Sequence, residues 1–476
     1  MDNFSNKLSE DIFKYVTCAA QELGTDAYVV GGYVRDLLLQ RESKDIDIVT
    51  SGNGLKLALA TAQKANIPAD SVTLFKTYGT AMFRYQGIEV EFVGARKESY
   101  SSHSRNPKVE SGTLEDDQNR RDFTINAMAI SLNDSDFGDF FDPFNGLSDL
   151  NHKLIKTPLD PVHTFTDDPL RIMRGIRFAA QLGFSVEKET LIGMKTKAER
   201  LSIISKERIA EELHKILLSH KPSKGFLLLD EVGILDYILP ALVRLKGVET
   251  INRQSHKDNF LHTLEVVDSL SLNSQNLWLL WAALLHDVGK ADTKKYLPET
   301  GWTFHQHEVI GSKMVPKIFR SLRMPLNEKM EYVKKMVFLH LRPIALVEDV
   351  VTDSAIRRLL FDAGDDIDDL MLLCEADITS KNQAKVFQYL TNFEMVRQKL
   401  ADIEEKDRIR NFQPPIDGDL IMNLFNLVPC REVGLIKNAI REAILEGEVA
   451  NDYQVCYQFM LNYAKNELGL QPKTDI

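Results

Sequence analysis

The sequence of 476 residues is poor in the features that mark disulfide scaffolds, membrane proteins and repeat proteins. Its longest strongly apolar run, residues 277–285, is far shorter than the roughly 20 residues that cross a bilayer. Residues 1–23 are acidic and amphipathic rather than signal-like, and no fixed-period repeat is visible. The few cysteines lack metal-knuckle or CxxC spacing, and they are Cys18, Cys374, Cys430 and Cys456. We therefore expect reduced thiols, no membrane partner and a cytoplasmic protein.

Positive charge is also scarce, because 58 Lys and Arg face 69 Asp and Glu, which leaves a net charge of −11. This balance argues against a protein that coats nucleic acid indiscriminately, and no DNA partner is expected. Residues 171–224 break the acidic trend with many Lys and Arg side chains. This segment is the best candidate for local contact with RNA phosphates, although a charged run is also typical of a solvated helix face.

Apolar patterning predicts an α+β chain. Short strands are expected at 27–30, 46–49, 80–85 and 87–93, with helices between them, and they form a small mixed sheet within the first 150 residues. Residues 97–120 are polar and aperiodic, which predicts a long mobile loop. Beyond Asp167 almost every segment has helical periodicity, so helical domains should follow the α/β head.

Two aspartates in the sequence KDIDI, Asp45 and Asp47, lie two residues apart on a predicted strand. Their side chains therefore leave the same face and can bind Mg²⁺, with Glu91 of a later strand as a third ligand. Gly31 and Gly32 would let backbone N–H groups approach a triphosphate that Arg35 grips. Taken singly, a DxD strand edge and a Gly-Gly turn are more often structural than functional. Their combination and order point to phosphoryl transfer.

These residues resemble the nucleotidyltransferase superfamily. GGYVRD at 31–36 precedes the DID of 45–47, RRDFTINA follows at 120–127, DDPLRIMRGIRF at 167–178 and ERI at 207–209. In this order the motifs are similar to those of class II tRNA nucleotidyltransferases and bacterial poly(A) polymerases, and they cover about the first 240 residues. Asp167 stands where the family usually has Glu.

The resemblance implies that Arg121, Arg174 and Arg177 bind the triphosphate, while Asp168 and Arg171 face the incoming base. A carboxylate accepts a hydrogen bond from the exocyclic amine of C or A, and a guanidinium donates to the adjacent acceptor. Asp168 also suits a helix N-cap before a proline, and both roles can hold.

A second DxxR pattern runs from Asp117 to Arg120. It lacks further arginines at three-residue helical spacing and is rejected as the base reader.

A second constellation lies in the helical region. HDVGK at 286–290 ends the apolar run of 277–285, and His262 precedes it. These residues resemble the HD phosphohydrolase superfamily, in which such side chains hold a divalent ion that activates water. The resemblance implies that the ligands are His262, His286, Asp287 and Asp377. His307 and His340 are additional ligands or phosphate contacts, with His305 as the competing choice for the third histidine.

The resulting prediction is a nucleotidyltransferase head at 1–150, a helical nucleotide-selecting and RNA-binding region at 151–250, an HD domain at 251–385 and a helical region of possible tRNA contact at 386–476. The implied activity is addition of C, C and A to the tRNA 3′ end from CTP and ATP, with Mg²⁺ in the head and a divalent metal in the HD domain. Phosphohydrolase activity is implied for the latter.

Three alternatives stay open from sequence. A poly(A) polymerase, or an enzyme adding only CC or only A, shares the head motifs, although residues 469–476 lack the strongly basic tail common in poly(A) polymerases. An HD hydrolase with a non-catalytic nucleotide-sensing head is the second. A non-catalytic RNA-binding module is the third.

Overall fold

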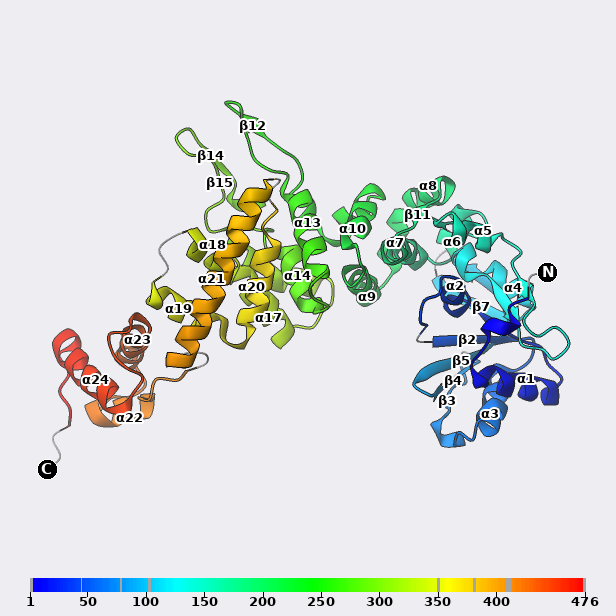
Figure 1. The fold of residues 1–476 in the computed structure, drawn as a ribbon, viewed down its shortest axis with the longest axis horizontal. Helices are drawn as coiled ribbons and strands as arrows, with labels where there is room; N and C mark the ends of the chain where they lie inside the picture. The colour runs from blue at the N-terminus through cyan, green and yellow to red at the C-terminus, as the bar shows by residue number, and fades with distance from the viewer. Residues whose placement is uncertain are drawn as a thin grey trace. The chain divides into compact units, whose positions relative to one another are not determined.

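The computed structural model describes residues 3–43, 45–77, 79–101, 104–348, 352–379, 382–407 and 412–473. Two units divide the chain, residues 1–240 and residues 241–476, and each is treated by itself (Figure 1). The first contains a mixed sheet with helices, and the second is mostly helical. The expected α+β class is confirmed.

A seven-stranded sheet in the order β3-β4-β5-β2-β1-β8-β9 forms the base of the first unit. Only β2 and β5 pair in parallel, and the other neighbours are antiparallel. The strands are β1 Ala27–Val30, β2 Asp45–Thr50, β3 Thr73–Phe75, β4 Thr80–Tyr85, β5 Ile88–Gly94, β8 Ala129–Ser131 and β9 Phe140–Phe141. The predicted mixed sheet is therefore present, extended at both edges by strands that the sequence did not indicate.

Alternation along β2 assigns its two faces. Ile46 and Ile48 are buried on one face of the sheet. Asp45 and Asp47, which alternate with them, project from the opposite face because successive side chains of a strand alternate. Helices α1 (Asp11–Leu23) and α3 (Gly54–Lys64) pack together, and α3 also contacts β2, β4 and β5. One face of the sheet is thus covered by helices, which leaves the other for the aspartates.

The long loop expected at 97–120 is wrong. Strands β6 (Arg96–Ser101) and β7 (Ser104–Ser111) form an antiparallel ribbon, and α4 (Leu114–Asn119) follows it. The sequence of this segment is polar and shows no alternation of apolar residues, so it gave no strand signal. The capping box of Thr113 and Asp116 at the start of α4 was a readable signal.

Helices complete the first unit. The helix that carries the predicted base-reading residues is α7 (Leu170–Leu182), which begins after Pro169 and ends at Gly183 in the left-handed conformation. Its buried residues Ile172, Met173, Ile176 and Ala179 follow helical spacing. The other helices are α2 Gly32–Leu38, α5 Gly146–Asn151, α6 Pro161–Asp167, α8 Lys188–Lys197, α9 Lys206–Leu217, α10 Pro222–Glu231 and α11 Leu235–Ile238, and the short strands β10 Leu154–Ile155 and β11 Ser185–Val186 pair in parallel. Helix α12, Pro240–Val243, spans the boundary between the two units in the sequence.

The second unit is built around α14 (Leu277–Leu285), whose residues 279–285 are all buried. The apolar run of the sequence is therefore a core helix. The remaining helices are α13 Asn259–Ser271, α15 Lys290–Thr293, α16 His307–Ser321, α17 Glu328–Leu339, α18 Leu341–Glu348, α19 Asp353–Ala363, α20 Ile367–Ala376, α21 Gln383–Asp407, α22 Gly418–Phe425, α23 Arg431–Glu446 and α24 Tyr453–Leu468.

The expectation of purely helical domains needs one correction. Two hairpins interrupt the helices, β12 (Thr250–Ile251) with β13 (Gln254–Ser255), and β14 (Lys295–Leu297) with β15 (Gly301–Thr303). Strands of two or three residues are too short to show a period of two. Within the described residues, none of the helices combines the length and the apolar character that crossing a membrane requires.

Candidate active site and metal centre

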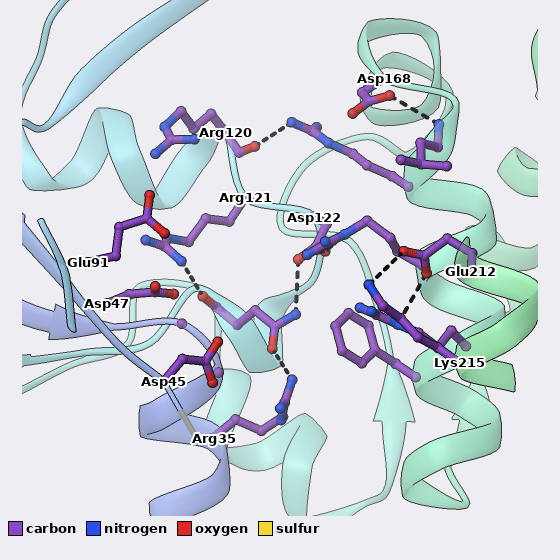
Figure 2. Close-up of a pocket in the computed structure, with 18 of the residues that line it drawn as sticks. Arg35, Asp45, Asp47, Glu91, Arg120, Arg121, Asp122, Asp168, Glu212 and Lys215 are labelled. Carbon is purple, nitrogen blue, oxygen red and sulfur yellow. Dashed lines mark hydrogen bonds and ion pairs between the residues drawn. The ribbon is translucent and has the colours of Figure 1, made fainter. Parts of the chain in front are cut away.

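The sheet face opposite α3 carries a row of carboxylates. In the parallel register of β2 and β5, Asp47 lies directly beside Glu91 and Asp45 beside Glu89. Asp45, Asp47 and Glu91 line one cavity of about 1310 Å³ (Figure 2). All three predicted oxygen ligands therefore meet in a single pocket, and hard oxygen donors of this kind suit Mg²⁺.

Electrostatics favours a cation in this row. Burial raises the pKa of Asp47, and the negative charges of Asp45 and Asp117 add to that effect, while Arg121 opposes it. Burial likewise raises the pKa of Glu91, with Asp47 as the next cause. Crowded, partly desolvated carboxylates resist ionisation, so a bound divalent cation would relieve their repulsion. The donor set fits the metal that the sequence implied.

Gly31 is held in a conformation that other residues avoid, with φ of 75° and ψ of −137° immediately before α2. A Cβ atom at this position would lie 2.9 Å from Asp47 Oδ2 and 3.0 Å from Arg121 Nη1. Gly32 is less constrained, since a Cβ there would meet only Arg35 Nη2, at 3.6 Å. The first glycine is thus required by the carboxylate row itself.

A chain of hydrogen bonds links α2 to α7 across the cavity. Arg35 Nη1 donates to Asn126 Oδ1 at 2.8 Å, and Asn126 Nδ2 donates to Asp122 Oδ1 at 3.0 Å. Arg174 Nε then donates to Asp122 Oδ2 at 2.7 Å. Burial opposes ionisation of Asp122, but the charge of Arg174 together with the hydrogen bonds from Asn126 and Arg174 outweighs it and lowers the pKa of this carboxyl.

Sequence reasoning quoted the RRDFTINA string but assigned no role to Asp122 or Asn126. Their spacing of four residues within the string was the available signal. The structure shows that they orient two of the predicted phosphate-binding arginines.

Asp117, the first residue of the rejected DxxR pattern, contacts Arg121. Asp117 is fully buried and pairs with both Arg120 and Arg121, the latter through Nε to Oδ2 at 2.9 Å. Burial raises the pKa of Asp117, but the two guanidinium groups overcome that effect and lower it. Asp117 therefore positions Arg121 beside the carboxylate row.

Helix α7 brings the predicted base-reading and phosphate-binding residues to the same cavity, which Asp168, Arg171, Arg174 and Arg177 all line. Asp168 Oδ1 accepts a hydrogen bond from the Leu170 backbone N–H at 3.1 Å, so it also caps the helix. Arg171 Nη2 donates to the backbone carbonyl of Arg120 at 2.6 Å. The three-residue spacing read from the sequence does place these side chains on one side of the helix.

Phe178 is a residue that sequence reasoning missed. The guanidinium groups of Arg35, Arg174 and Arg177 lie 5.1, 5.6 and 4.3 Å from its ring centroid, in cation–π range. The ring gathers three cations that would otherwise repel one another. Glu212 of α9, which Figure 2 labels, forms an ion pair with Arg177, with Oε2 and Nε 3.2 Å apart.

The second unit gathers the predicted HD residues at the ends of its core helices. His262 comes from α13, His286 and Asp287 follow α14, and His340 and Asp377 follow α17 and α20. His262 Nε2 lies 2.8 Å from Asp377 Oδ1, and His286 Nε2 lies 3.3 Å from Asp287 Oδ2.

His307, the first residue of α16, completes the cluster. Its Nε2 lies 3.3 Å from Asp287 Oδ1 and 3.3 Å from His340 Nε2. His305 is exposed. The structure thus brings His307 rather than His305 to Asp287.

The outer nitrogens of three of these rings face backbone carbonyls. His286 Nδ1 donates to Ala283 O at 2.8 Å, His307 Nδ1 to Phe304 O at 2.8 Å, and His340 Nδ1 to Val337 O at 2.7 Å. Such bonds fix the tautomer that presents a lone pair on Nε2, as metal-ligating histidines require.

His307 Nε2 and His340 Nε2 face each other at 3.3 Å, and a bound cation could take both nitrogens as ligands. The cluster resolves into two ligand triads that share Asp287, one with His262 and His286 and the other with His307 and His340. Burial disfavours a charged His286, but Asp287 and Asp377 outweigh it and raise its pKa to about 10. Burial and the charge of His286 lower the pKa of His340 to about 3. Asp287 and Asp377 therefore stabilise positive charge beside His286, and the donor set of carboxylate and imidazole groups fits a divalent metal.

The geometry of Gly31 yields a prediction. Gly31→Ala should lower the free energy of unfolding by about 2 kcal/mol because of backbone strain, and it should also abolish Mg²⁺-dependent CTP binding by displacing Asp47 or Arg121. Urea denaturation and calorimetric titration measure the two effects.

Gly24 is the matched control, since its φ is also positive, 62°, and a Cβ there meets nothing within 4 Å. Gly24→Ala should cost about 1 kcal/mol and leave CTP binding intact. Wild-type CTP affinity in Gly31→Ala would contradict the packing argument.

Comparison with known proteins identifies three segments. Residues 27–156 match the "Poly A polymerase head domain", residues 183–245 the "Probable RNA and SrmB- binding site of polymerase A", and residues 259–381 the "HD domain". The head match contains the carboxylate row and the Gly-Gly turn. The HD match contains every residue of the metal cluster.

Whole-chain relatives agree with these segments. The chain is 31% identical to an A-adding tRNA nucleotidyltransferase of Deinococcus radiodurans over 75% of this chain and 81% of the relative, and 31% identical to a multifunctional CCA protein of Vibrio parahaemolyticus over 74% and 84%. A third relative, an A-adding tRNA nucleotidyltransferase of Aquifex aeolicus, is 45% identical over 34% of this chain, which spans only 19% of that protein.

Among solved structures, the CCA-adding enzyme of Bacillus stearothermophilus in complex with CTP shares the fold, with a TM-score of 0.68, 23% identity and coverage of 97% of this chain and 99% of that one. Relatives that match most of this chain are tRNA nucleotidyltransferases. This finding argues against a head that only senses nucleotides and against a non-catalytic RNA-binding module. The chain belongs to the class II tRNA nucleotidyltransferase family and is a tRNA nucleotidyltransferase enzyme that carries an HD domain.

Proposed function

We propose that this enzyme adds C, C and A in turn to the 3′ end of tRNA from CTP and ATP, and that its HD cluster hydrolyses phosphate esters. In this proposal residues 1–150 form the catalytic head, 151–250 select the nucleotide and contact RNA, 251–385 form the hydrolase and 386–476 contact tRNA. The observation that carries the first part is one cavity lined both by Asp45 and Asp47 and by Asp168 and Arg171.

The chain's own groups suggest a division of labour in transfer. Arg121, Arg174 and Arg177 bind the triphosphate, with Asp117 and Asp122 holding Arg121 and Arg174 in place. Asp45, Asp47 and Glu91 would hold Mg²⁺, which supplies activation of the attacking hydroxyl and stabilisation of the leaving pyrophosphate. The 3′ oxygen of the primer then forms a bond to the α-phosphorus, and the bond to the pyrophosphate oxygen breaks.

Base selection rests on Asp168 and Arg171. The Asp168 carboxylate accepts from the exocyclic amine that C and A share, and Arg171 donates to the neighbouring ring nitrogen. U and G present a carbonyl where the amine should be, and the carboxylate would then face an acceptor. The contact of Arg171 with the Arg120 carbonyl restrains that guanidinium, which lines the same cavity as Asp168.

Addition of A alone is the second candidate, because two relatives that match this chain, from Deinococcus radiodurans and Aquifex aeolicus, are A-adding enzymes. The Vibrio relative is a multifunctional CCA protein at the same 31% identity as the Deinococcus one. CC-only addition and poly(A) synthesis use the same chemistry.

The HD cluster supports hydrolysis of phosphate esters. Its two triads would hold divalent metal, which supplies a nucleophilic water at neutral pH. The water oxygen forms a bond to phosphorus, the ester P–O bond breaks, and the leaving alkoxide takes a proton. Lys290 Nζ, 2.6 Å from Asp287 Oδ2, lies where it can neutralise a phosphate oxygen.

The specificity of addition is tested with tRNAs that lack the last three, two or one nucleotides, incubated with Mg²⁺, CTP and ATP, followed by sequencing of the 3′ ends. We expect all three to end in CCA and to grow no further. Asp45→Ala and Asp47→Ala should each lower the rate by about three orders of magnitude, the loss of several kcal/mol of stabilisation. Extension of the last substrate alone would establish an A-adding enzyme, and a long A tail a poly(A) polymerase.

Replacing the base reader should relax nucleotide choice. In Asp168→Asn the amide can donate to the carbonyl of U or G, so the ratio of kcat/KM for CTP to that for UTP should fall at least about tenfold. The oxygen that caps α7 is retained, so the melting temperature should hold. Asp160→Asn is the matched control, since Asp160 caps α6 through His163 N at 2.9 Å. Equal relaxation in both variants would rule out Asp168 as the reader.

Separate substitutions of His307 and His305 test the HD cluster. His307→Ala should weaken metal binding at least about tenfold and abolish hydrolysis of p-nitrophenyl phosphate with Mg²⁺, Mn²⁺ or Ni²⁺. His305→Ala should behave as wild type because its side chain is exposed. Metal titration calorimetry and a phosphate-release assay are the measurements. Absence of hydrolysis by the wild-type chain with all three metals would end the hydrolase proposal.

A further inference from the structure

Tyr33 lies in α2 between two residues that line the cavity of the carboxylate row, Gly32 and Arg35, but it is not part of the lining. Its side chain is buried. The hydroxyl donates a hydrogen bond to Glu10 Oε1 at 2.8 Å, and the ring meets that of Phe13 edge-on, with the centroids 5.4 Å apart. Glu10 directly precedes α1, and Phe13 belongs to it. Tyr33 therefore ties α2, which follows the Gly-Gly turn, to the start of α1.

Glu10 is an unusual partner, because one oxygen of its carboxylate is left over. Oε2 is buried and has no hydrogen-bond partner among the described residues. The side chain does not cap α1 either, although Glu10 occupies the N-cap position. A buried carboxylate oxygen without a partner costs stability, and such a group in a native protein calls for an explanation. The carboxylate of Glu10 thus serves Tyr33 rather than the helix that it precedes.

The protonation state of Tyr33 suits a permanent link. Burial and the hydrogen bond to Glu10 both raise the pKa of the Tyr33 hydroxyl, so the hydroxyl keeps its proton and remains a donor. The bond joins a neutral donor to a carboxylate, and hydrogen bonds of this kind are stronger than those between two neutral groups.

Helix α2 depends on such a link because it is short and its position at the cavity is tightly constrained. It spans seven residues, and no side chain of a described residue caps its first turn. At Gly31, directly before it, a Cβ would lie 2.9 Å from Asp47 Oδ2, so a small shift of this turn would press the backbone against the carboxylate row. From the cavity side the helix is held by the hydrogen bond from Arg35 to Asn126. Tyr33 points to a different side of the helix and restrains it there.

We propose that Tyr33 and Glu10 are positioning residues for nucleotide transfer, which hold α2 so that Gly31 and Arg35 keep the places required to bind the triphosphate. Neither residue touches the nucleotide, and neither takes part in the chemical step. The inference rests on the proposed assignment of this cavity to the triphosphate, and it holds whether the enzyme adds CCA or A alone.

The test compares Tyr33→Phe with wild type in the full chain. Calorimetric titration measures Kd for ATP with Mg²⁺, and steady-state addition of A to a tRNA that ends in CC measures kcat and KM. Loss of the hydroxyl should raise Kd and KM for ATP about tenfold and change kcat less than about threefold, because the displaced groups bind the triphosphate and the metal-binding carboxylates lie on β2 and β5. Glu10→Gln keeps an oxygen acceptor for the hydroxyl, so its KM should stay within about twofold of wild type, whereas Glu10→Leu should match Tyr33→Phe.

Two further variants separate positioning from stability. In the second unit Tyr332 OH donates to Asp369 Oδ2 at 2.5 Å, so Tyr332→Phe loses the same kind of bond at a residue that does not line the cavity. It should lower Tm and leave KM for ATP unchanged. The double variant of Tyr33→Phe with Glu10→Leu removes the donor and the acceptor together, so it should recover most of the Tm that Tyr33→Phe loses while KM stays raised.

A wild-type KM for ATP in Tyr33→Phe, with a lowered Tm, would overturn the proposal, because the bond would then be structural alone. Recovery of both Tm and KM in the double variant would overturn it as well. Failure of the wild-type chain to bind ATP with Mg²⁺ would end the triphosphate assignment itself, and with it the inference, before any variant is compared.

Discussion

The parallel register of β2 and β5 is the constraint on which the rest of the head depends. It sets Asp47 beside Glu91 on the sheet face that the helices leave open. Negative charge concentrated there, in partial isolation from water, favours a divalent cation and draws in Arg121. The same crowding forces the chain at residue 31 to be glycine, because Asp47 Oδ2 and Arg121 Nη1 occupy the space of a side chain. The turn at Gly31, the pairing of β2 with β5 and the position of Arg121 therefore all depend on the carboxylates of this sheet face.

The arginines present the opposite charge problem, since several guanidinium groups lie together in the cavity that is proposed to bind a triphosphate. Different side chains hold these guanidinium groups in place. Asp117 holds Arg121, Asp122 holds Arg174, and the ring of Phe178 lies against the cations of Arg35, Arg174 and Arg177. Preorganised cations of this kind lose little entropy when an anionic ligand binds.

In the second unit the same logic operates with nitrogen ligands. Helix ends converge on Asp287, and carbonyl acceptors at Ala283, Phe304 and Val337 turn the ring nitrogens inward. The Nε2 atoms of these rings face the cluster, where they are shielded from water, and a bound metal would take them as ligands.

The sequence by itself determined the α+β class, the strands at 27–30 and 80–85, the DID row and the family to which its motifs belong, because these are recorded in local periodicity and fixed spacing. It missed the 96–111 ribbon, whose sequence is polar without apolar alternation, and both small hairpins, whose strands of two or three residues are too short to show a period of two. Only the tertiary structure decided that His307 rather than His305 reaches Asp287, and that Asp122 and Phe178 organise the arginines. Those contacts join residues far apart in sequence, and no local pattern records which distant side chain will be the partner.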